Sequence, residues 1–404
     1  MIDQAIDTDG GGIMEPDASI SIVREIMTDF ADSTGLSSSK RPQRRYLWTD
    51  AFAVCNFLEL FRQTHDENFR GLALRLVDQV HHTLGRHRRD DPRSGWISGL
   101  DADQGETHPT RGGLRIGKQL DERRRGEPLN ERLEWDRDGQ YYHYLTKWMH
   151  ALNRVGVATA DPAYLRWGME LAQTAHTRFT HTHPGDGRKR LYWKMSIDLG
   201  YPLVLAMGQH DPLDGLVTYS ELQSAASREF AYSALPDLSS EISDMAVICG
   251  EENWTTNDTL GLGGLLIDAW RIAQLMTRGG FVDVGLFEAV LDAARLGLES
   301  FKADNPLKYR ARQRLPFREL GLAIGLKGVG MMQGCIGKNP GSPDLERSLQ
   351  RKVEALSGYL PLSNIIERFW LDKKNREAGN WSEHREINMV MLATSLAPEG
   401  FLTV

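Results

Sequence analysis

Segments that would form helices apolar on nearly every face recur along this chain, and they constrain its fold more than any other feature. Residues 51–58, 260–267 and 320–326 are the clearest of them. A helix without a polar face must be covered by protein on all sides. Between them lie amphipathic segments, such as 66–84 and 283–301, whose apolar residues recur every three or four positions. We therefore expect buried inner helices that are enclosed by amphipathic outer helices.

The two kinds of segment alternate regularly. Inner helices are predicted to begin near residues 46, 139, 194, 257, 317 and 383, and outer helices to lie near 66–85, 161–180, 214–231, 283–301 and 343–358, with a sixth near 18–31. Most intervals between inner helices are roughly 55 to 65 residues, which fits two helices and two connections. This spacing predicts a closed ring of six helical hairpins. An open helical solenoid or two bundles is the alternative.

Glycines interrupt the predicted inner helices at several positions. They are Gly261, Gly263, Gly264, Gly321 and Gly325. Each costs about 1 kcal/mol of helix propensity relative to alanine. Their presence makes sense if the inner helices crowd a common axis.

The interval between the first two inner helices is longer than the others. Its surplus, residues 86–134, is rich in Arg, Asp and Gly and contains Trp96 and Ile97. A long insertion without a strong apolar pattern is usually a functional loop or a disordered one. We predict a lid over the open end of the ring, completed by Trp96, with disorder between 102 and 130 as the alternative. The predicted organisation is a flexible N-terminus at 1–17 and one toroid domain at 18–404.

Composition excludes several classes of protein. The 404 residues include 25% charged and 41% hydrophobic ones, and the net charge is −7. This balance does not support a nucleic-acid or anionic-membrane partner. The three cysteines show neither disulfide nor metal spacing, and neither a signal peptide nor a membrane-spanning run is visible. We predict a soluble cytoplasmic protein without a cofactor or bound metal, and its oligomeric state stays open.

Residues capable of chemistry gather where the inner helices are predicted to begin. Tryptophans mark these starts: Trp48, Trp135, Trp193, Trp254 and Trp381 lie at or just before them, and Trp96 lies in the insertion. Indole rings offer a large apolar face and one hydrogen-bond donor, which suits stacking on sugar rings. The set predicts a carbohydrate-binding cavity at one open mouth, whereas any single ring could simply be core. Further substrate-binding candidates are Tyr141, Asp198, Asp258, Glu319 and Arg385.

Two aspartates are the candidate catalytic carboxylates. Glycoside hydrolysis needs one protonated and one ionised carboxyl group. Apolar neighbours would desolvate Asp50 and raise its pKa toward that of an acid, whereas charged and polar neighbours could hold Asp138 ionised. The alternative for each is a helix N-cap, a common role for aspartate.

Two histidines occupy equivalent positions. His143 and His384 would lie at the same mouth, and imidazole titrates near neutral pH, so the pair could move a proton to and from a sugar carbon. The alternative is a polar supporting role for both. No phosphate-binding loop, nucleophile elbow or dinucleotide fingerprint is present.

Two segments are similar to parts of known enzymes. Residues 46–52 are similar to the Trp-Thr-Asp-Gly-Phe opening of unsaturated glucuronyl hydrolases, with Ala51 in place of the glycine. Residues 380–385 resemble the last Trp and His segment of N-acylglucosamine and cellobiose epimerases. Across roughly residues 18–400 the chain resembles the six-hairpin glycosidase-like superfamily, the (α/α)6 toroids. The resemblance implies an all-α toroid acting on carbohydrate, through inner-helix aspartates in the first branch or proton-transferring histidines in the second.

These observations favour a carbohydrate-active enzyme with a small-molecule or oligosaccharide ligand. The first hypothesis is a glycoside hydrolase that uses Asp50 and Asp138. The second is a sugar epimerase or isomerase that uses His143 and His384. The third is a toroid that binds a glycan or a protein and catalyses nothing.

Overall fold

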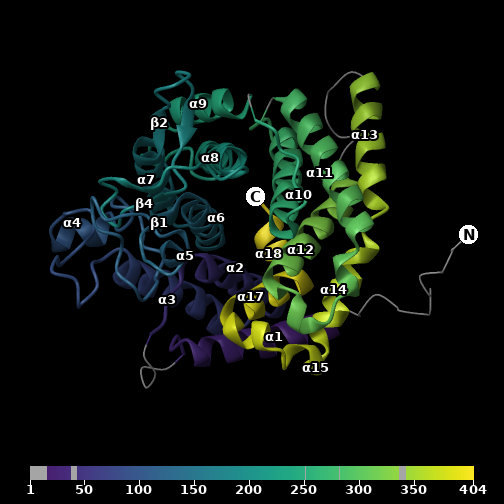
Figure 1. The fold of residues 1–404 in the computed structure, drawn as a ribbon, viewed down its shortest axis with the longest axis horizontal. Coiled ribbons are helices and arrows are strands. Elements are labelled where there is room, and N and C mark those ends of the chain that lie inside the picture. Colours follow the sequence, from purple (N-terminus) through teal and green to yellow (C-terminus); the bar gives the residue numbers. More distant parts are fainter. Residues whose placement is uncertain (1–15, 38–42, 251, 282, 336–342) are drawn as a thin grey trace, which may run out of the picture.

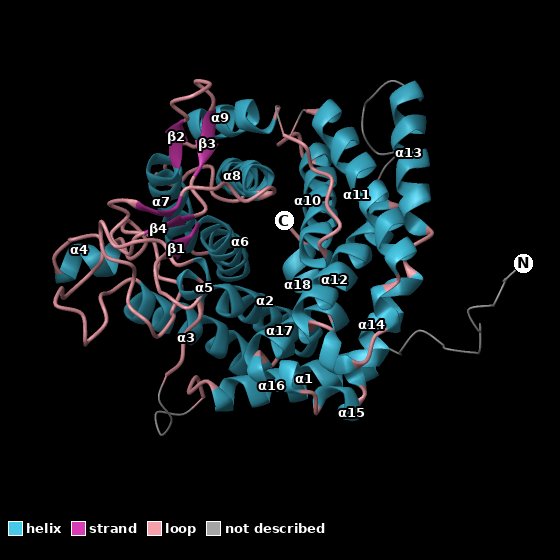
Figure 2. Ribbon diagram, viewed as in Figure 1, coloured by secondary structure: helices cyan, strands magenta, loops and turns pink. Residues whose placement is uncertain are grey.

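The architecture is two concentric rings of helices (Figures 1 and 2). The structure is a computed structural model that describes residues 16–37, 43–250, 252–281, 283–335 and 343–404. Within these ranges the inner ring consists of α2 (Leu47–Thr64), α6 (Tyr142–Thr159), α8 (Asp211–Arg228), α10 (Thr259–Thr277), α12 (Pro316–Met332) and α17 (Arg385–Leu396). Each inner helix packs against the next, and α17 packs against α2, which closes the ring.

Outer helices cover this ring. They are α1 (Pro16–Ser33), α3 (Glu67–Leu84), α7 (Pro162–Phe179), α9 (Ser239–Cys249), α11 (Val284–Asp304), α13 (Pro343–Ser357) and α14 (Pro361–Leu371). Each of α3, α7, α9 and α11 packs on the inner helix that precedes it in sequence. α14 packs mainly on α12, α13 contacts α11 and α12, and α1 covers α17 and α2. The predicted all-α (α/α)6 toroid is therefore confirmed.

Short elements fill the connections. The helices are α4 (Ala102–Thr107), α5 (Glu131–Glu134), α15 (Lys373–Arg376), α16 (Gly379–Glu383) and α18 (Glu399–Leu402), with 3-10 turns at Pro306–Lys308 and Ala311–Gln313. The strands β1 (Gln140–Tyr141), β4 (Lys194–Met195) and β5 (Pro202–Val204) form an antiparallel sheet in the order β1-β4-β5, and β2 (Thr180–Thr182) pairs with β3 (Lys189–Leu191). The insertion is described along its whole length, and of the predicted flexible segment 1–17 only the first residues of α1 are described.

The third inner helix is not where the sequence predicts it. The segment after Trp193 forms β4, whose Lys194 pairs with Tyr141 of β1. The inner helix is α8, which the sequence pattern assigned to the outer ring, and its outer partner is α9. The pattern was misleading because α8 carries polar residues that are nevertheless buried, including Asp211, Asp214 and Glu221.

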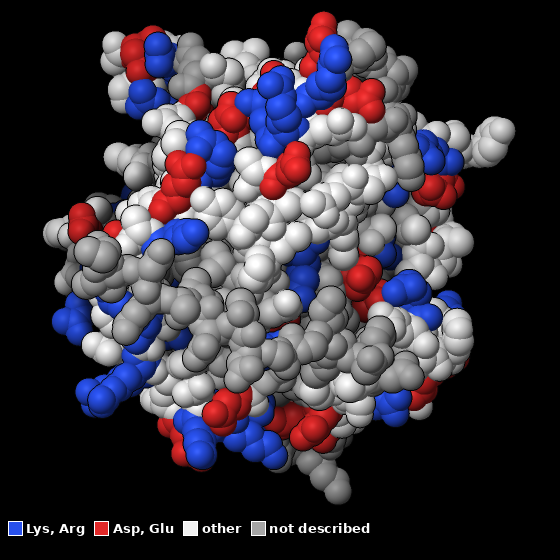
Figure 3. All heavy atoms as spheres, turned by 90° about the vertical axis from the view of Figure 1, so that its right-hand side faces the viewer, with Lys and Arg blue, Asp and Glu red and all other residues white. Residues whose placement is uncertain are grey.

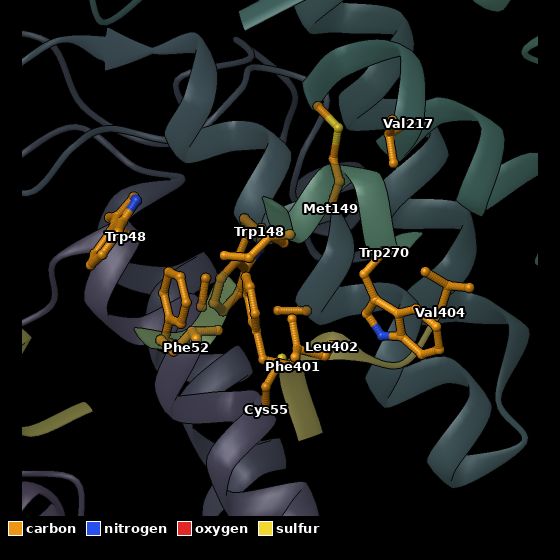
Figure 4. Close-up of a cluster of buried hydrophobic side chains, with 14 of the residues drawn as sticks. Trp48, Phe52, Cys55, Trp148, Met149, Val217, Trp270, Phe401, Leu402 and Val404 are labelled. Carbon is orange, nitrogen blue, oxygen red and sulfur yellow. The ribbon is translucent and has the colours of Figure 1, made fainter. Parts of the chain in front are cut away.

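The C-terminal segment closes the end of the ring where the inner helices end. Phe401 of α18 stacks on Phe52 of α2, with ring centroids 4.1 Å apart, and both lie in the apolar cluster of Figure 4. The carbonyl of Phe401 accepts a hydrogen bond from His150 Nε2 at 2.8 Å, and that of Leu402 accepts one from Gln274 Nε2 at 2.8 Å. A ligand that reaches the inner ring must therefore approach from the opposite end, where the inner helices begin.

The glycines crowd one helix pair rather than a common axis. A Cβ atom added at Gly263 of α10 would lie 2.4 Å from the carbonyl of Gly321 in α12, and one at Gly325 would lie 2.6 Å from the carbonyl of Gly263. One at Gly264 would meet nothing within 4 Å. The glycines do allow inner helices to approach closely, as expected, but the close approach is between α10 and α12.

The outer helices present mixed charge to solvent. On the face formed by α11, α13 and α14, basic and acidic side chains are interspersed (Figure 3). Lys352 of α13 pairs with Asp292 of α11 at 2.6 Å, and Arg295 pairs with Glu299 one turn further along α11. Exposed pairs of this kind are each worth about 0–1 kcal/mol, so they add little to the stability of the ring.

Candidate functional site

A cavity of about 510 Å³, here called the mouth cavity, lies at the end of the ring where the inner helices begin, beside the starts of α2 and α17; α6, α8, α10 and α12 contribute none of its lining residues. Its size falls in the range of roughly 300–1,000 Å³ that is usual for small-molecule sites. The ends of α1 and α3 and residues 115–119 of the insertion complete its wall. Side chains that can exchange protons or carry charge in this wall are Arg44, Arg45, Tyr46, Asp50, Arg88, Arg115, Lys118, Glu383, His384 and Glu386.

Asp50 is the buried carboxyl group of this wall. It lies in the first turn of α2 with 1% of its surface exposed. One oxygen accepts the backbone N–H of Tyr46 at 2.9 Å, and the other lies 3.4 Å from Arg45 Nη1. Burial raises the pKa of Asp50 to about 6, although Arg45 and the Tyr46 N–H both lower it. A carboxyl group in this state can hold a proton at mildly acidic pH and donate it.

Asp138 does not line the cavity. It is fully buried, and its carboxylate lies 2.5 Å from Arg115 Nη1 and accepts the backbone N–H of Gly117 at 3.0 Å. Arg115 also donates to the carbonyls of Thr83 and Arg86, at 2.6 and 2.8 Å. The catalytic role of Asp138 stays a prediction, and these surroundings favour a different one. The aspartate anchors Arg115 and, through it, the part of the insertion that forms the cavity wall.

The start of α17 supplies the opposite wall. His384 lines the cavity, and its ring meets Phe317 edge-on, with centroids 5.5 Å apart. Glu386 pairs with Arg44 at 3.3 Å. Glu383 also lines the cavity, is exposed, and has no ion-pair partner within the described residues. Sequence reasoning found His384 but missed Glu383, which precedes it directly in the same cluster.

Aromatic rings gather on the side of the mouth formed by α2 and α6. The hydroxyl of Tyr46 lies 2.8 Å from that of Tyr144, and the Tyr144 ring contacts those of Trp48, Tyr141 and His143. The remaining members belong to the segments before α6 and α8. Tyr141 packs on Trp193 at 5.3 Å, and Trp193 packs on Trp135 at 4.9 Å, with half of the Trp135 surface exposed. The structure thus brings together four of the predicted substrate-binding residues: Trp48, Trp135, Tyr141 and Trp193.

Trp96 lies elsewhere. It is 2% exposed, and the guanidinium of Arg86 lies 5.0 Å from its ring centroid. An added Cβ at Gly105 would come within 2.1 Å of the indole, so α4 packs directly on the ring. This placement corrects the expectation that Trp96 completes the mouth. The insertion contributes to the cavity through residues 115–119, and Trp96 is part of its own core.

The other predicted acids and Arg385 form ion pairs with neighbouring segments instead of lining the cavity. Asp258 caps α10 and pairs with Arg318, Glu319 pairs with Arg314 at 2.6 Å, and Arg385 pairs with Asp29 of α1.

Three further predicted residues also lie outside this cavity. Asp198 lies in the turn between β4 and β5, where it accepts a hydrogen bond from Ser196 Oγ at 2.7 Å. Trp254 is buried, and its carbonyl lies 3.3 Å from His210 Nε2. Trp381 stacks on Trp370 with centroids 5.8 Å apart.

A polar cluster on α6 and α8 contains the predicted His143, whereas its partner Asp211 escaped sequence reasoning. His143 Nδ1 lies 3.8 Å from Asp211 Oδ1, and both His143 Nδ1 and Asp211 Oδ2 are buried without a hydrogen-bond partner. Trp193 stacks on the His143 ring with an interplanar angle of 14°. Asp211 lies in the first turn of α8, which is the place that Asp198 was predicted to fill. The Asp-Pro pair at 211–212 is a helix-start signal that could have revealed this position.

The environment of this pair shifts both pKa values. Burial and the nearby Asp214 raise the pKa of Asp211 to about 7. Burial and the Lys147 ammonium lower the pKa of His143. Near neutral pH the pair therefore includes a neutral imidazole beside a carboxyl group that still holds part of its proton.

A charged network continues below this pair. Lys147 Nζ lies 2.7 Å from Asp214, and Arg271 of α10 bridges Asp214, Asp268 and Glu221. His150 completes the network through a 2.8 Å contact with Glu221. Each of these charged groups has a partner of opposite sign, which is what burial requires.

None of the helices in the described ranges combines the length and hydropathy that a membrane span requires. Among the same residues, no three His, Cys, Asp or Glu side chains come together as metal ligands. All three cysteines are free, and Cys55 and Cys249 are buried.

Comparisons with known proteins give distant likenesses. No family model matches the chain, and no curated protein matches its sequence. Cellobiose 2-epimerase from Spirochaeta thermophila is 13% identical over 94% of this chain and 98% of its own, with a TM-score of 0.47. Cellobiose 2-epimerase from Bacillus thermoamylovorans is 10% identical over 85% and 87%, with a TM-score of 0.45. A GH76 alpha-mannanase from Bacteroides thetaiotaomicron is 11% identical over 89% and 100%, with a TM-score of 0.46.

Likenesses at such identities and TM-scores bear on neither substrate nor mechanism. The closed ring rests on the helix contacts described above.

Proposed function

We propose that this protein is a carbohydrate-active enzyme that cleaves a glycosidic bond in the mouth cavity, with Asp50 as the general acid. The observation that carries the proposal is a buried carboxyl group with a raised pKa in the wall of a cavity of suitable size. Protonation of the leaving oxygen requires such a group, because an ordinary aspartic acid is already ionised at the pH where most enzymes work. Tyr46 and His384 would contact the sugar from the same wall.

A hydrolase also needs an ionised carboxylate, and two residues are candidates. Asp138, the sequence prediction, is ion-paired but enclosed. Glu383 is exposed in the cavity and has no ion-pair partner among the described residues. We therefore assign the second carboxylate to Glu383 and a positioning role to Asp138.

The experiment is a hydrolysis screen of the full chain against glycosides and oligosaccharides. The wild type should cleave at least one class, and Asp50→Asn and Glu383→Gln should each reduce kcat/KM by 100-fold or more, since acid–base groups contribute about 10²–10⁴-fold. Glu354→Gln, an exposed carboxylate on α13, is the matched control and should change nothing. Cleavage that survives Asp50→Asn would refute the assignment. Saturable sugar binding without turnover would instead support the third hypothesis, a toroid that binds a glycan and catalyses nothing.

A second candidate is supported by the His143 and Asp211 pair. A sugar epimerase or isomerase removes a proton from a carbon next to a carbonyl and returns one, and a neutral imidazole beside a protonated carboxyl group could do both. The sequence prediction paired His143 with His384, whereas the residue beside His143 is Asp211. Solvent deuterium that enters a sugar without bond cleavage, and that no longer enters with His143→Gln, would establish this reaction in place of hydrolysis.

A further inference from the structure

A second polar cavity lies at the opposite end of the ring from the mouth. Its volume is about 190 Å³, and it is bounded by the C-terminal parts of α6, α8 and α10 and by residues 403–404. A neighbouring hollow of about 300 Å³ shares Ser224, Arg228 and Arg278 with it. Neither hollow includes any residue of the mouth cavity.

Three arginines from three inner helices meet in this cavity. Arg154 comes from α6, Arg228 from the last turn of α8, and Arg278 directly follows α10. Within the described ranges neither Arg154 nor Arg228 forms an ion pair or a side-chain hydrogen bond, and Arg154 Nε is buried without a partner. Arg278 is anchored by a 2.6 Å hydrogen bond from Nη1 to the oxygen of Val404.

Among the described residues, no acidic side chain forms an ion pair with any of the three arginines. Glu221 also lines the cavity, but its carboxylate is already bonded to His150, Asn153 and Arg271. Glu229 is exposed at the rim. Burial and repulsion from Arg228 lower the pKa of Arg278, as expected where like charges face each other.

We propose that this cavity binds a small oxyanion, a phosphate group either free or carried on a small metabolite. Guanidinium groups are the side chains best suited to phosphate oxygens, because they donate several hydrogen bonds in a fixed planar geometry. Ser224, which lines both hollows, offers a further hydroxyl donor. A volume below the roughly 300 Å³ of typical ligand sites suits a phosphate group better than an oligosaccharide.

The alternative is structural. Arginines at the C-terminal end of a helix interact favourably with the negative end of its dipole, and Arg228 lies in the last turn of α8 while Arg278 directly follows α10. This role requires no ligand, so anion binding separates the two explanations.

The test is calorimetric titration of the full chain with inorganic phosphate, at a constant ionic strength set by chloride. We expect saturable binding that weakens at least tenfold in Arg154→Gln/Arg228→Gln and in the single variant Arg228→Gln, whose exposed side chain can change without unfolding the helix. Arg351→Gln, an exposed arginine on α13, is the matched control and should bind like the wild type. Circular dichroism confirms that each variant is folded.

A second titration, with a hexose phosphate, shows whether the cavity binds free phosphate or a phosphate group carried on a metabolite. Tighter binding of the hexose phosphate than of phosphate indicates a phosphorylated metabolite, and equal or weaker binding indicates the free ion. The proposal is overturned if phosphate shows no saturable binding above the chloride background, or if the arginine variants bind as well as the wild type. Neither result bears on the reaction at the mouth, which is assayed separately.

Discussion

Arg115 and Asp138 form a buried ion pair that joins the insertion to the segment before β1. The two groups lie 2.5 Å apart, and 4% and 0% of their side-chain surfaces are exposed. Removal of one partner from such a pair leaves the other charge buried without compensation, which costs about 3–5 kcal/mol. The pair therefore ties this part of the cavity wall to the segment that leads into α6.

Arg115→Gln should lower the free energy of unfolding by about 3–5 kcal/mol, because Asp138 would remain charged and enclosed. Lys118→Gln, three residues further along the same wall, should change it by less than about 0.5 kcal/mol, since Lys118 forms no ion pair among the described residues. Urea unfolding measures both values. If Asp138→Asn does not restore part of the loss in Arg115→Gln, the pair is not the cause.

Asp211 should make stability depend on pH. Its folded pKa of about 7 exceeds the ordinary value of 3.8, so the folded state binds its proton more tightly than the unfolded state does. The stability from this proton is fully present below pH 3.8 and is lost as the pH rises through about 7. Asp211→Asn carries no ionisable group, so its stability relative to wild type should increase across this window.

The upper limit of that increase is about 4 kcal/mol, because each pKa unit corresponds to about 1.36 kcal/mol. Thermal unfolding at pH 4, 5.5 and 7.5 measures this difference in stability between Asp211→Asn and wild type. Asp103→Asn, which replaces an exposed aspartate of α4, is the control, and its difference from wild type should not change with pH. A difference between Asp211→Asn and wild type that does not change with pH would show that Asp211 is already ionised in the folded protein.

Neighbouring glycines of α10 should respond in opposite ways to the same substitution. In Gly263→Ala the new Cβ would lie 2.4 Å from the backbone of Gly321, so α10 and α12 must separate, at a cost of about 1–3 kcal/mol or more. In Gly264→Ala the new Cβ meets nothing within 4 Å, and helix propensity should add up to about 1 kcal/mol of stability. Denaturant midpoints test the pair, and equal effects would contradict the observed packing.

The ring could be predicted because burial on all faces is a property that a sequence displays directly. Segments such as 51–58 and 260–267 have no polar face, and they did become inner helices. The same criterion failed at α8, since Asp211, Asp214 and Glu221 interrupt its apolar surface. Asp214 and Glu221 are buried because Lys147, His150 and Arg271 pair with them from α6 and α10, and partners on other helices cannot be read from the spacing of one helix.

The candidate site could be predicted only as an end of the ring. Asp50 and His384 line one cavity because α2 and α17 are neighbours once the ring closes. Asp258 and Glu319 also lie where inner helices begin, but Arg318 and Arg314 neutralise them. The position of a residue at a helix start thus indicates at which end of the ring it lies. Whether its side chain is free to bind a ligand depends on ion pairs with other segments, which the sequence pattern does not predict.

If Asp50 donates a proton to the leaving oxygen, the effect of replacing Asp50 must depend on the leaving group. The measurement is kcat/KM of wild type and Asp50→Asn on two glycosides of one sugar, one with a strongly acidic phenol as leaving group and one with an alkyl alcohol. An acidic phenol leaves without protonation, so Asp50→Asn should lose 100-fold or more on the alkyl glycoside and less than about tenfold on the aryl one. Equal losses on both substrates, or no loss on either, would contradict the role assigned to Asp50.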